Sequence, residues 1–202
     1  MSTCLGIMTF AARLHTAGRG AVAAHLLALS RQDRRLRFGG AASDAAIHDY
    51  VAGIDFDRDA VFGFLADDMS LGGAVHVAVV DGVAELGVSV LAAYRHRGVG
   101  SALFQRALDF ARDHCARTLY MRCLTENAAM MRIARRAGMK IVTGGGAADA
   151  YLQLPPPDAG TVATQFVQEC IALFDHSLRA QGARLASPAG PNDGESVGAG
   201  CQ

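Results

Sequence analysis

Several features that would assign the chain to a specialised class of protein are missing from its sequence. Its five cysteines are scattered, odd in number and without a Cys-x-x-Cys pair, which argues against a disulfide framework and for a reducing compartment. Its seven histidines show no metal-ligand spacing such as His-x-x-x-His, so no metal site is expected. The 19 basic and 19 acidic residues balance, which leaves neither a nucleic-acid footprint nor a polybasic membrane patch.

Long apolar runs are missing as well. The longest, Leu71–Val80, has the length of a buried strand and falls short of the roughly 18 residues of a membrane helix. The apolar start, Met1–Phe10, has no basic segment before it and no cleavage-like motif, so no signal peptide is expected. With 202 residues, 51% of them hydrophobic, we expect one cytoplasmic domain with a sizeable core.

The periodicity of the apolar residues predicts helices and strands in a mixed order, which favours an α/β (α+β) fold. Helical spacing marks residues 16–30, 44–54, 99–115 and 126–137, with Ser43 as an N-cap and Gly138 as a C-cap. Strand patterns mark residues 8–14, 60–65, 73–80, 83–91, 118–124, 139–143 and 150–154. Asp81-Gly82 is a strong type I′ hairpin signal, whereas Gly144-Gly145-Gly146 is expected to be a flexible loop.

The C-terminal part has a different composition. Three prolines at 155–157 are expected to end the regular domain, which is placed at residues 1–157. Residues 158–182 are predicted to hold an additional amphipathic helix, which either packs back on the domain or forms a homodimer interface. Residues 183–202 are rich in Gly, Ala, Ser and Pro and are expected to be a flexible tail.

The stretch 94–103 concentrates the candidate chemistry. It follows a predicted strand and opens a predicted helix, and the unpaired N–H groups and dipole of a helix N-terminus suit a phosphate or pyrophosphate. Gly98 and Gly100 let the backbone come close to an anion, since neither carries a Cβ atom. Arg95 and Arg97 add guanidinium groups that can bind phosphate oxygens.

Two familiar nucleotide loops do not fit this stretch. A Walker loop needs Lys-Ser/Thr after its last glycine, where Ser101 and Ala102 stand, and a dinucleotide fingerprint needs a third glycine where Leu103 stands. A nucleotide-binding module is therefore disfavoured. The pattern Arg-x-x-Gly-x-Gly instead resembles the acyl-CoA pyrophosphate loop of the GNAT superfamily of N-acyltransferases.

A second segment, Thr125–Met139, resembles the other GNAT signature, Asn-x-x-(Ala/Met)-x-x-Leu-x-x-x-x-Gly-Phe. It lies on the helix after the next strand, where the family places it. The likeness covers about residues 8–154 and is strongest over 83–140. Its variant at Met130 and Ile133-Ala134 is closest to the acyltransferase domains that modify protein lysines.

The resemblance implies a mixed, mostly antiparallel sheet of six to seven strands, split at the cofactor groove, with flanking helices and the additional C-terminal helix. It implies acetyl-CoA or another acyl-CoA as cofactor, and a small-molecule amine or a protein lysine as acceptor, which attacks the thioester directly. The first two helices would cover the acceptor site. The cofactor-binding residues implied are Val90, Leu91, Arg95, Arg97, Gly98, Val99, Gly100, Ser101 and Asn127. For Asn127 the alternative is a helix cap only.

Glu85 is the candidate general base. On an ideal strand Glu85, Gly87 and Ser89 share a face, and the two small residues leave a groove with the carboxylate at its far end. Partial burial is expected to raise the affinity of Glu85 for a proton. The alternative is a solvent-facing acid at a strand end, and a bulge in the strand would change which residues share the face.

No general acid stands at the position where many GNAT enzymes carry a tyrosine, because that residue is Ala134. Tyr120 and Tyr151 are conceivable substitutes, although packing roles are favoured for both. Cys123 is discounted as a nucleophile, because no histidine is placed to activate it.

Two alternatives stay open. The missing tyrosine leaves room for a catalytically weak or inactive acyl-CoA-binding regulatory module. The basic cluster at 31–37 is interpreted as a solvated helix end, with a site for an acidic substrate or for the 3′-phosphate of CoA as the alternative.

Overall fold

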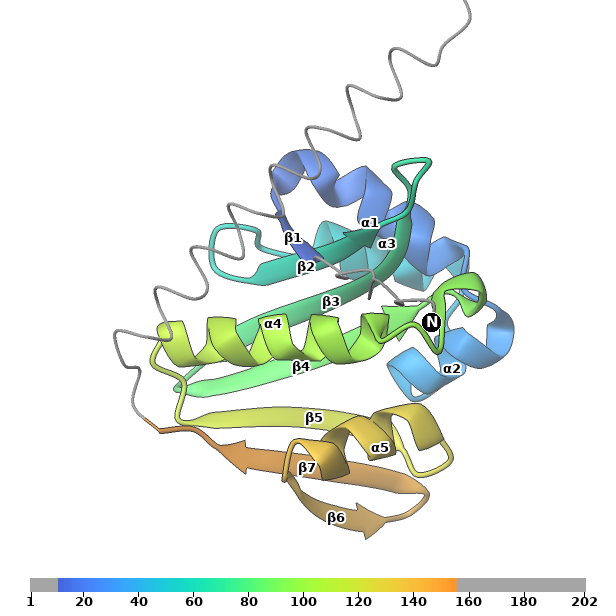
Figure 1. Cartoon of the computed structure of the whole chain (residues 1–202). Helices are drawn as coiled ribbons and strands as arrows, with labels where there is room; N and C mark the ends of the chain where they lie inside the picture. The colour runs from blue at the N-terminus through green and yellow to red at the C-terminus, as the bar shows by residue number, and fades with distance from the viewer. Residues whose placement is uncertain (1–10, 156–202) are drawn as a thin grey trace, which may run out of the picture.

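The computed structural model describes residues 11–155 (Figure 1). The predicted C-terminal helix, its homodimer surface, the tail and the domain boundary at 157 lie outside the described residues. The strands are β1 (Ala11–Leu14), β2 (Ala60–Leu65), β3 (Leu71–Val80), β4 (Val83–Val90), β5 (Thr118–Leu124), β6 (Lys140–Gly144) and β7 (Ala147–Gln153). The helices are α1 (Arg19–Leu27), α2 (Arg31–Phe38), α3 (Asp44–Ala52), α4 (Val99–Asp113) and α5 (Ala128–Arg136), with short 3₁₀ turns at Thr16–Gly18 and Ala92–Tyr94.

Within the described part the strands form one seven-stranded sheet in the order β1-β2-β3-β4-β5-β7-β6, which confirms the predicted mixed, mostly antiparallel sheet. The single parallel contact joins β4 to β5, and its register covers only Val83–Glu85 against Thr118–Tyr120. Beyond that point β4 pairs with β3 alone up to Val90, while β5 pairs with β7 up to Leu124. The two strands therefore separate in the middle of the sheet, as Figure 1 shows.

Local sequence signals account for most element ends. Asp81 and Gly82 both have positive φ, 51° and 78°, as the type I′ hairpin requires. The expected flexible loop at 144–146 is wrong: Gly145 and Gly146 take φ of 59° and 80° and form a tight turn, so Gly144 already pairs with Ala147. Strand β7 accordingly starts three residues before the predicted one.

The predicted helix caps are also present. The Ser43 side chain accepts a hydrogen bond from the Ala46 N–H at 3.2 Å, which starts α3 where expected. Gly138, with φ of 72°, follows α5, and the Met139 N–H donates to the Ala134 carbonyl at 3.0 Å. The basic cluster at 31–37 is not a solvated helix end. It forms the separate helix α2, because Ser30 caps it and the left-handed Gly39 ends it.

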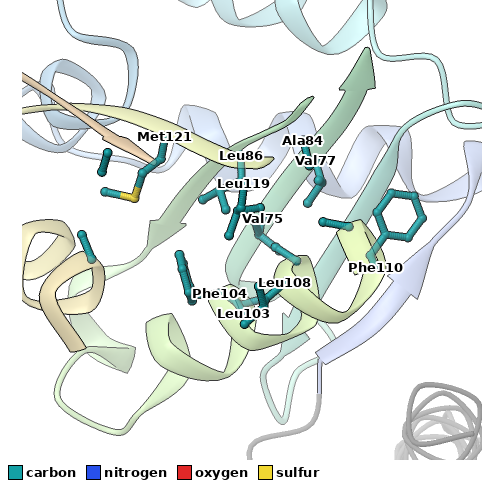
Figure 2. Packing of buried hydrophobic residues seen from close by; sticks show 14 of the residues in the cluster. Val75, Val77, Ala84, Leu86, Leu103, Phe104, Leu108, Phe110, Leu119 and Met121 are labelled. Carbon is teal, nitrogen blue, oxygen red and sulfur yellow. The ribbon is translucent and has the colours of Figure 1, made fainter. Parts of the chain in front are cut away.

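Helix α4 lies across one face of the sheet and supplies the centre of the main core (Figures 1 and 2). Its Leu103 and Phe110 side chains have no exposed surface, and they pack with Val75 of β3 and Leu119 of β5. On the other face, α1 and α3 close a second cluster that includes the fully buried Ile47. Helix α2 contacts both β4 and β5 and so lies over the place where these strands separate.

Among residues 11–155, no helix combines the length and the apolar composition that crossing a bilayer requires.

Candidate functional site

The separation of β4 from β5 opens a cavity of about 610 Å³, within the usual range of about 300–1,000 Å³ for small-molecule sites. Four parts of the chain line it: α2, the end of β4, the N-terminal turn of α4, and α5. Of the predicted site residues, the lining includes Val90, Arg95, Gly98, Val99, Gly100, Ser101 and Asn127. The structure thus brings both sequence motifs to one cavity.

The N-terminus of α4 has the form of an anion site. Gly98 is its N-cap residue, with φ of 81°, and within residues 11–155 no side chain caps the helix. The first N–H groups of a helix lack intrahelical acceptors and carry the positive end of its dipole. A Cβ at Gly98 would meet no atom within 4 Å, so this glycine serves the backbone conformation. A Cβ at Gly100 would lie 3.5 Å from Ile133 of α5, in ordinary contact.

The arginines around this turn differ from the expected arrangement. Arg95 lines the cavity, but its Nη2 pairs with Asp33 of α2 at 2.6 Å and its Nε donates to the Val90 carbonyl at 3.1 Å. Arg97 lies over the Tyr94 ring, 5.7 Å from its centroid, and is not part of the lining. Two further arginines, Arg132 and Arg136 of α5, also line the cavity. Their i, i+4 spacing in the sequence predicts a shared helix face and could have identified them.

The backbone of β4 offers free hydrogen-bonding groups on the side of the gap. The Leu91 N–H donates to the Gly72 carbonyl at 2.9 Å, so Leu91 is directed toward β3 and its N–H is engaged. In an antiparallel pair the direction alternates, and the Gly73–Val90 register then turns the N–H and C=O groups of Val88 and Val90 toward the gap. Val88 and Val90 line the cavity, whereas Leu91 does not.

Asn127 occupies the junction between α5 and α2. Its Oδ1 accepts a hydrogen bond from the Met130 N–H at 3.2 Å, so it is the N-cap of α5. Its Nδ2 donates to the Leu36 carbonyl at 3.5 Å. Nearby, Arg35 and Gln32 of α2 both bind Glu126. Asn127 therefore caps one helix and holds another over the cavity, and its contact with a cofactor stays a prediction.

Glu85 lies where β4 and β5 last pair, opposite Tyr120. The register of β4 with β3 is continuous from Val83 to Val90, so Glu85, Gly87 and Ser89 do share a face. The expected partial burial is wrong, however, because Glu85 is exposed, and it is not among the cavity-lining residues. Its role as general base therefore rests on its position alone.

The residues considered as acid or nucleophile lie away from the cavity. Ala134 is fully buried in the main core. Burial, together with a 2.6 Å hydrogen bond from its hydroxyl to Asp149 Oδ1, raises the pKa of Tyr120 to about 12. Burial also raises the pKa of the Cys123 thiol, which keeps it protonated. Tyr151 of β7 is 39% exposed, and its ring lies beside that of Tyr120, with 5.1 Å between the centroids.

A buried serine–histidine pair was not found from the sequence. His25 of α1 accepts or donates at both ring nitrogens: Nδ1 lies 2.8 Å from the Leu71 carbonyl and Nε2 lies 2.8 Å from Ser89 Oγ. A carbonyl only accepts, so Nδ1 carries the proton and the Ser89 hydroxyl donates to Nε2. Burial lowers the pKa of His25, which favours the neutral ring. Ser89 lines the cavity, and the separation of 64 positions between the partners left no local signal.

A second polar chain was also missed. Asp59 Oδ2 lies 3.0 Å from His76 Nε2, and His76 Nδ1 lies 2.7 Å from the Tyr50 hydroxyl. Arg37 Nη2 donates to the same hydroxyl at 2.8 Å. Burial lowers the pKa of His76, although the hydrogen bond to Asp59 opposes this effect. Nowhere in residues 11–155 do three or more His, Cys, Asp or Glu residues form a group that could hold a metal ion.

Comparison with known proteins agrees with this architecture. Residues 19–140, more than half of the chain, match the acetyltransferase (GNAT) domain family. Comparison with curated proteins found no match. The fold is similar to the GNAT domain of S. lividans PAT, at 18% identity and a TM-score of 0.60, covering 71% of this chain and 89% of that one.

Two further structures are similar in fold. An N-acetyltransferase from Staphylococcus aureus Mu50 has 16% identity and a TM-score of 0.57, with 72% of this chain and 98% of that one covered. The PaiA N-acetyltransferase from Thermoplasma acidophilum, solved in complex with coenzyme A, has 14% identity and a TM-score of 0.56, with 71% and 98% covered. The family match and the fold lead to one conclusion: the chain belongs to the GNAT acetyltransferase family.

Proposed function

We propose that the protein transfers an acetyl or similar acyl group from acyl-CoA to a primary amine by direct attack. One observation carries the proposal: β4 and β5 separate after Glu85, and the uncapped N-terminus of α4 opens onto the resulting cavity. This arrangement provides an anion site and an extended backbone edge side by side, which suits a ligand with a diphosphate and an amide-containing arm. The family match and a neighbour solved with coenzyme A support the same cofactor.

The residues fit the cofactor as follows. The N–H groups of Gly98–Ser101 would hold the diphosphate, with charge from Arg95 and from the two arginines of α5. Arg97 would add charge from outside the cavity. The N–H and C=O groups of Val88 and the N–H of Val90 would pair with the pantetheine amides, whereas the Val90 carbonyl already accepts from Arg95 Nε; one of the two N–H groups would polarise the thioester carbonyl. Leu91 would not bind the cofactor through its backbone, because its N–H is engaged and the residue does not line the cavity.

Two groups are candidates for removing the amine proton. Glu85 has the position that the sequence indicated, at the exposed end of the strand. The Ser89 hydroxyl lines the cavity and donates its hydrogen bond to His25 Nε2, so the serine oxygen can accept the amine proton while the hydroxyl proton moves to Nε2 of the neutral imidazole. Protonation of the leaving thiolate would come from water or from the same pair, because the buried Ala134 supplies no acid.

A binding and turnover experiment tests the proposal. CoA affinity is measured by isothermal titration calorimetry, and acetyl-CoA turnover is measured as free thiol with amino acids, polyamines, aminoglycosides and lysine peptides. We expect CoA binding and turnover with at least one amine class. Absence of CoA binding contradicts the proposal altogether. CoA binding without turnover on any amine supports instead the inactive acyl-CoA-binding regulatory module.

The two proton routes are separated by Glu85→Gln and Ser89→Ala. The variant that lacks the true base should lose turnover while its CoA affinity is unchanged. The loss of turnover should be smaller at high pH, because a larger fraction of the amine is then already deprotonated. Unchanged turnover and pH profile in one variant remove that residue from the mechanism.

A further inference from the structure

Arg37 of α2 carries a charge that the described part of the protein does not neutralise. Its neighbour Arg34 pairs with Asp44, and Arg35 pairs with Glu126. Within residues 11–155, Arg37 makes no ion pair, and its guanidinium makes one hydrogen bond, to the Tyr50 hydroxyl. Its Nε is buried without a hydrogen-bond partner.

A guanidinium has five N–H donors, and leaving a buried one unpaired costs free energy. Among residues 11–155 no carboxylate pairs with this group, whereas Asp44 pairs with Arg34 and Glu126 pairs with Arg35. Glu85 shares a face of β4 with Gly87, but within residues 11–155 it forms no ion pair with Arg37. Asp59 is engaged with His76. An arginine held in this way is suited to an anionic group that arrives with a ligand.

The guanidinium lies directly against the backbone of β4. A Cβ at Gly87 would lie 2.2 Å from the Arg37 guanidinium carbon, so any side chain at position 87 would occupy its place. Gly87 alternates with Leu86, which packs in the α4 core, so Arg37 approaches from the sheet face opposite α4. It therefore lies away from the helix N-terminus that would hold the diphosphate.

Arg37 is also fixed in place. The Phe38 and Tyr50 rings lie 5.0 Å and 5.5 Å from its guanidinium carbon. The Tyr50 hydroxyl is held in turn by His76. A cation positioned this way needs little reorganisation when it binds a partner.

We propose that Arg37 binds a carboxylate of the acceptor, so that the acceptor is an amine carrying a carboxylate close by, as an amino acid does. The proposal rests on the acyl transfer proposed above and names its substrate class. Arg37 and Ser89 line the same cavity. The guanidinium lies at Gly87, two residues from Ser89 along the strand, which corresponds to roughly 7 Å. That separation suits an amine and a carboxylate joined by a few bonds.

The test compares L-amino acids with the matching L-amino acid amides, with lysine peptides and with O-phosphoethanolamine. Turnover of acetyl-CoA is measured as kcat/KM for the wild type, for Arg37→Gln and for Gly87→Ala. An alanine methyl at position 87 would occupy the place of the Arg37 guanidinium and displace it, so this second variant tests the same contact if Arg37→Gln fails to fold. Arg31→Gln is the control, because Arg31 is an exposed residue of the same helix outside the cavity lining.

We expect the kcat/KM of the wild type to be roughly 10- to 100-fold higher for an amino acid than for its amide, which corresponds to the free energy of one charge-assisted hydrogen bond. Both site variants should reduce that ratio to near one, with the CoA Kd and the Arg31→Gln ratio unchanged. Equal rates with acid and amide, a preference for O-phosphoethanolamine, or an unchanged ratio in both variants would overturn the carboxylate assignment. So would a weakened CoA affinity in Arg37→Gln. Turnover confined to neutral amines contradicts this inference alone, whereas CoA binding with no turnover contradicts the proposed function as well.

Discussion

The ion pair between Arg95 and Asp33 predicts that removing a negative charge tightens CoA binding. The two side chains meet at 2.6 Å and are 39% and 16% exposed. Both residues line the cavity next to the α4 N-terminus. Asp33 therefore competes with a diphosphate for the guanidinium and also repels it. In Asp33→Asn the shape is kept, and the side chain can still accept the hydrogen bond from the Ser30 hydroxyl.

The magnitude follows from the exposure of the pair. A partly exposed ion pair contributes about 0.2–1 kcal/mol, so its release corresponds to a CoA Kd lower by up to about fivefold in Asp33→Asn. Arg95→Ala removes a charge-assisted hydrogen bond of about 1.5–3 kcal/mol and should raise the Kd by roughly 10- to 100-fold. In the Arg95→Ala background the Asp33 carboxylate has no guanidinium to hold, so the further gain from adding Asp33→Asn should shrink to the relief of repulsion alone.

The CoA Kd is measured by isothermal titration calorimetry at about 50 mM and about 500 mM salt. The four proteins compared are the wild type, Asp33→Asn, Arg95→Ala and the double variant. The gain from Asp33→Asn should be smaller at high salt, because the competing charges are screened. Arg31→Gln again serves as the control for a general loss of positive charge. A CoA Kd that Arg95→Ala leaves unchanged, or one that Asp33→Asn raises, would refute the assignment of this turn to the diphosphate.

Three further predictions concern the core and the buried histidine. Leu103→Ala, in the fully buried centre of α4, should lower the free energy of unfolding by about 2–5 kcal/mol in urea titrations, and a change below about 1 kcal/mol would contradict the packing. Ala134→Tyr should destabilise the protein by about 1–3 kcal/mol and add no turnover, because position 134 lies in the core; a gain in kcat would contradict this. The pKa of His25 is lowered below 6.5 by burial, so protonation favours the unfolded chain. The free energy of unfolding should therefore fall as the pH drops through about 6.5, and His25→Gln should flatten that dependence; an equal slope in the variant would contradict it.

Much of the fold was predictable because its signals act between near neighbours in the chain. Ser43 caps the turn that follows it, and Asp81-Gly82 bends the chain between two strands. The turn at Gly98 that begins α4 is another such local signal. A glycine in the left-handed region followed by a helix brings the backbone N–H groups of the first helical turn together. The local predictions failed where three glycines suggested flexibility and where four arginines suggested a solvated end.

The side chains that meet at the candidate site were determined by tertiary structure. Ser89 meets His25 across 64 residues, and Arg37 lies against Gly87 although no local spacing relates them. The exposure of Glu85 and the pairing of Arg95 with Asp33 likewise depend on how α2 lies over the divided sheet. The sequence by itself determined the turns, the caps and the glycine turn that begins α4, because these depend on backbone conformation within a few residues. Which side chains share the cavity, and with what charge and burial, was decided only when distant strands and helices packed together, because burial and Coulomb interactions depend on distance in space and not along the chain.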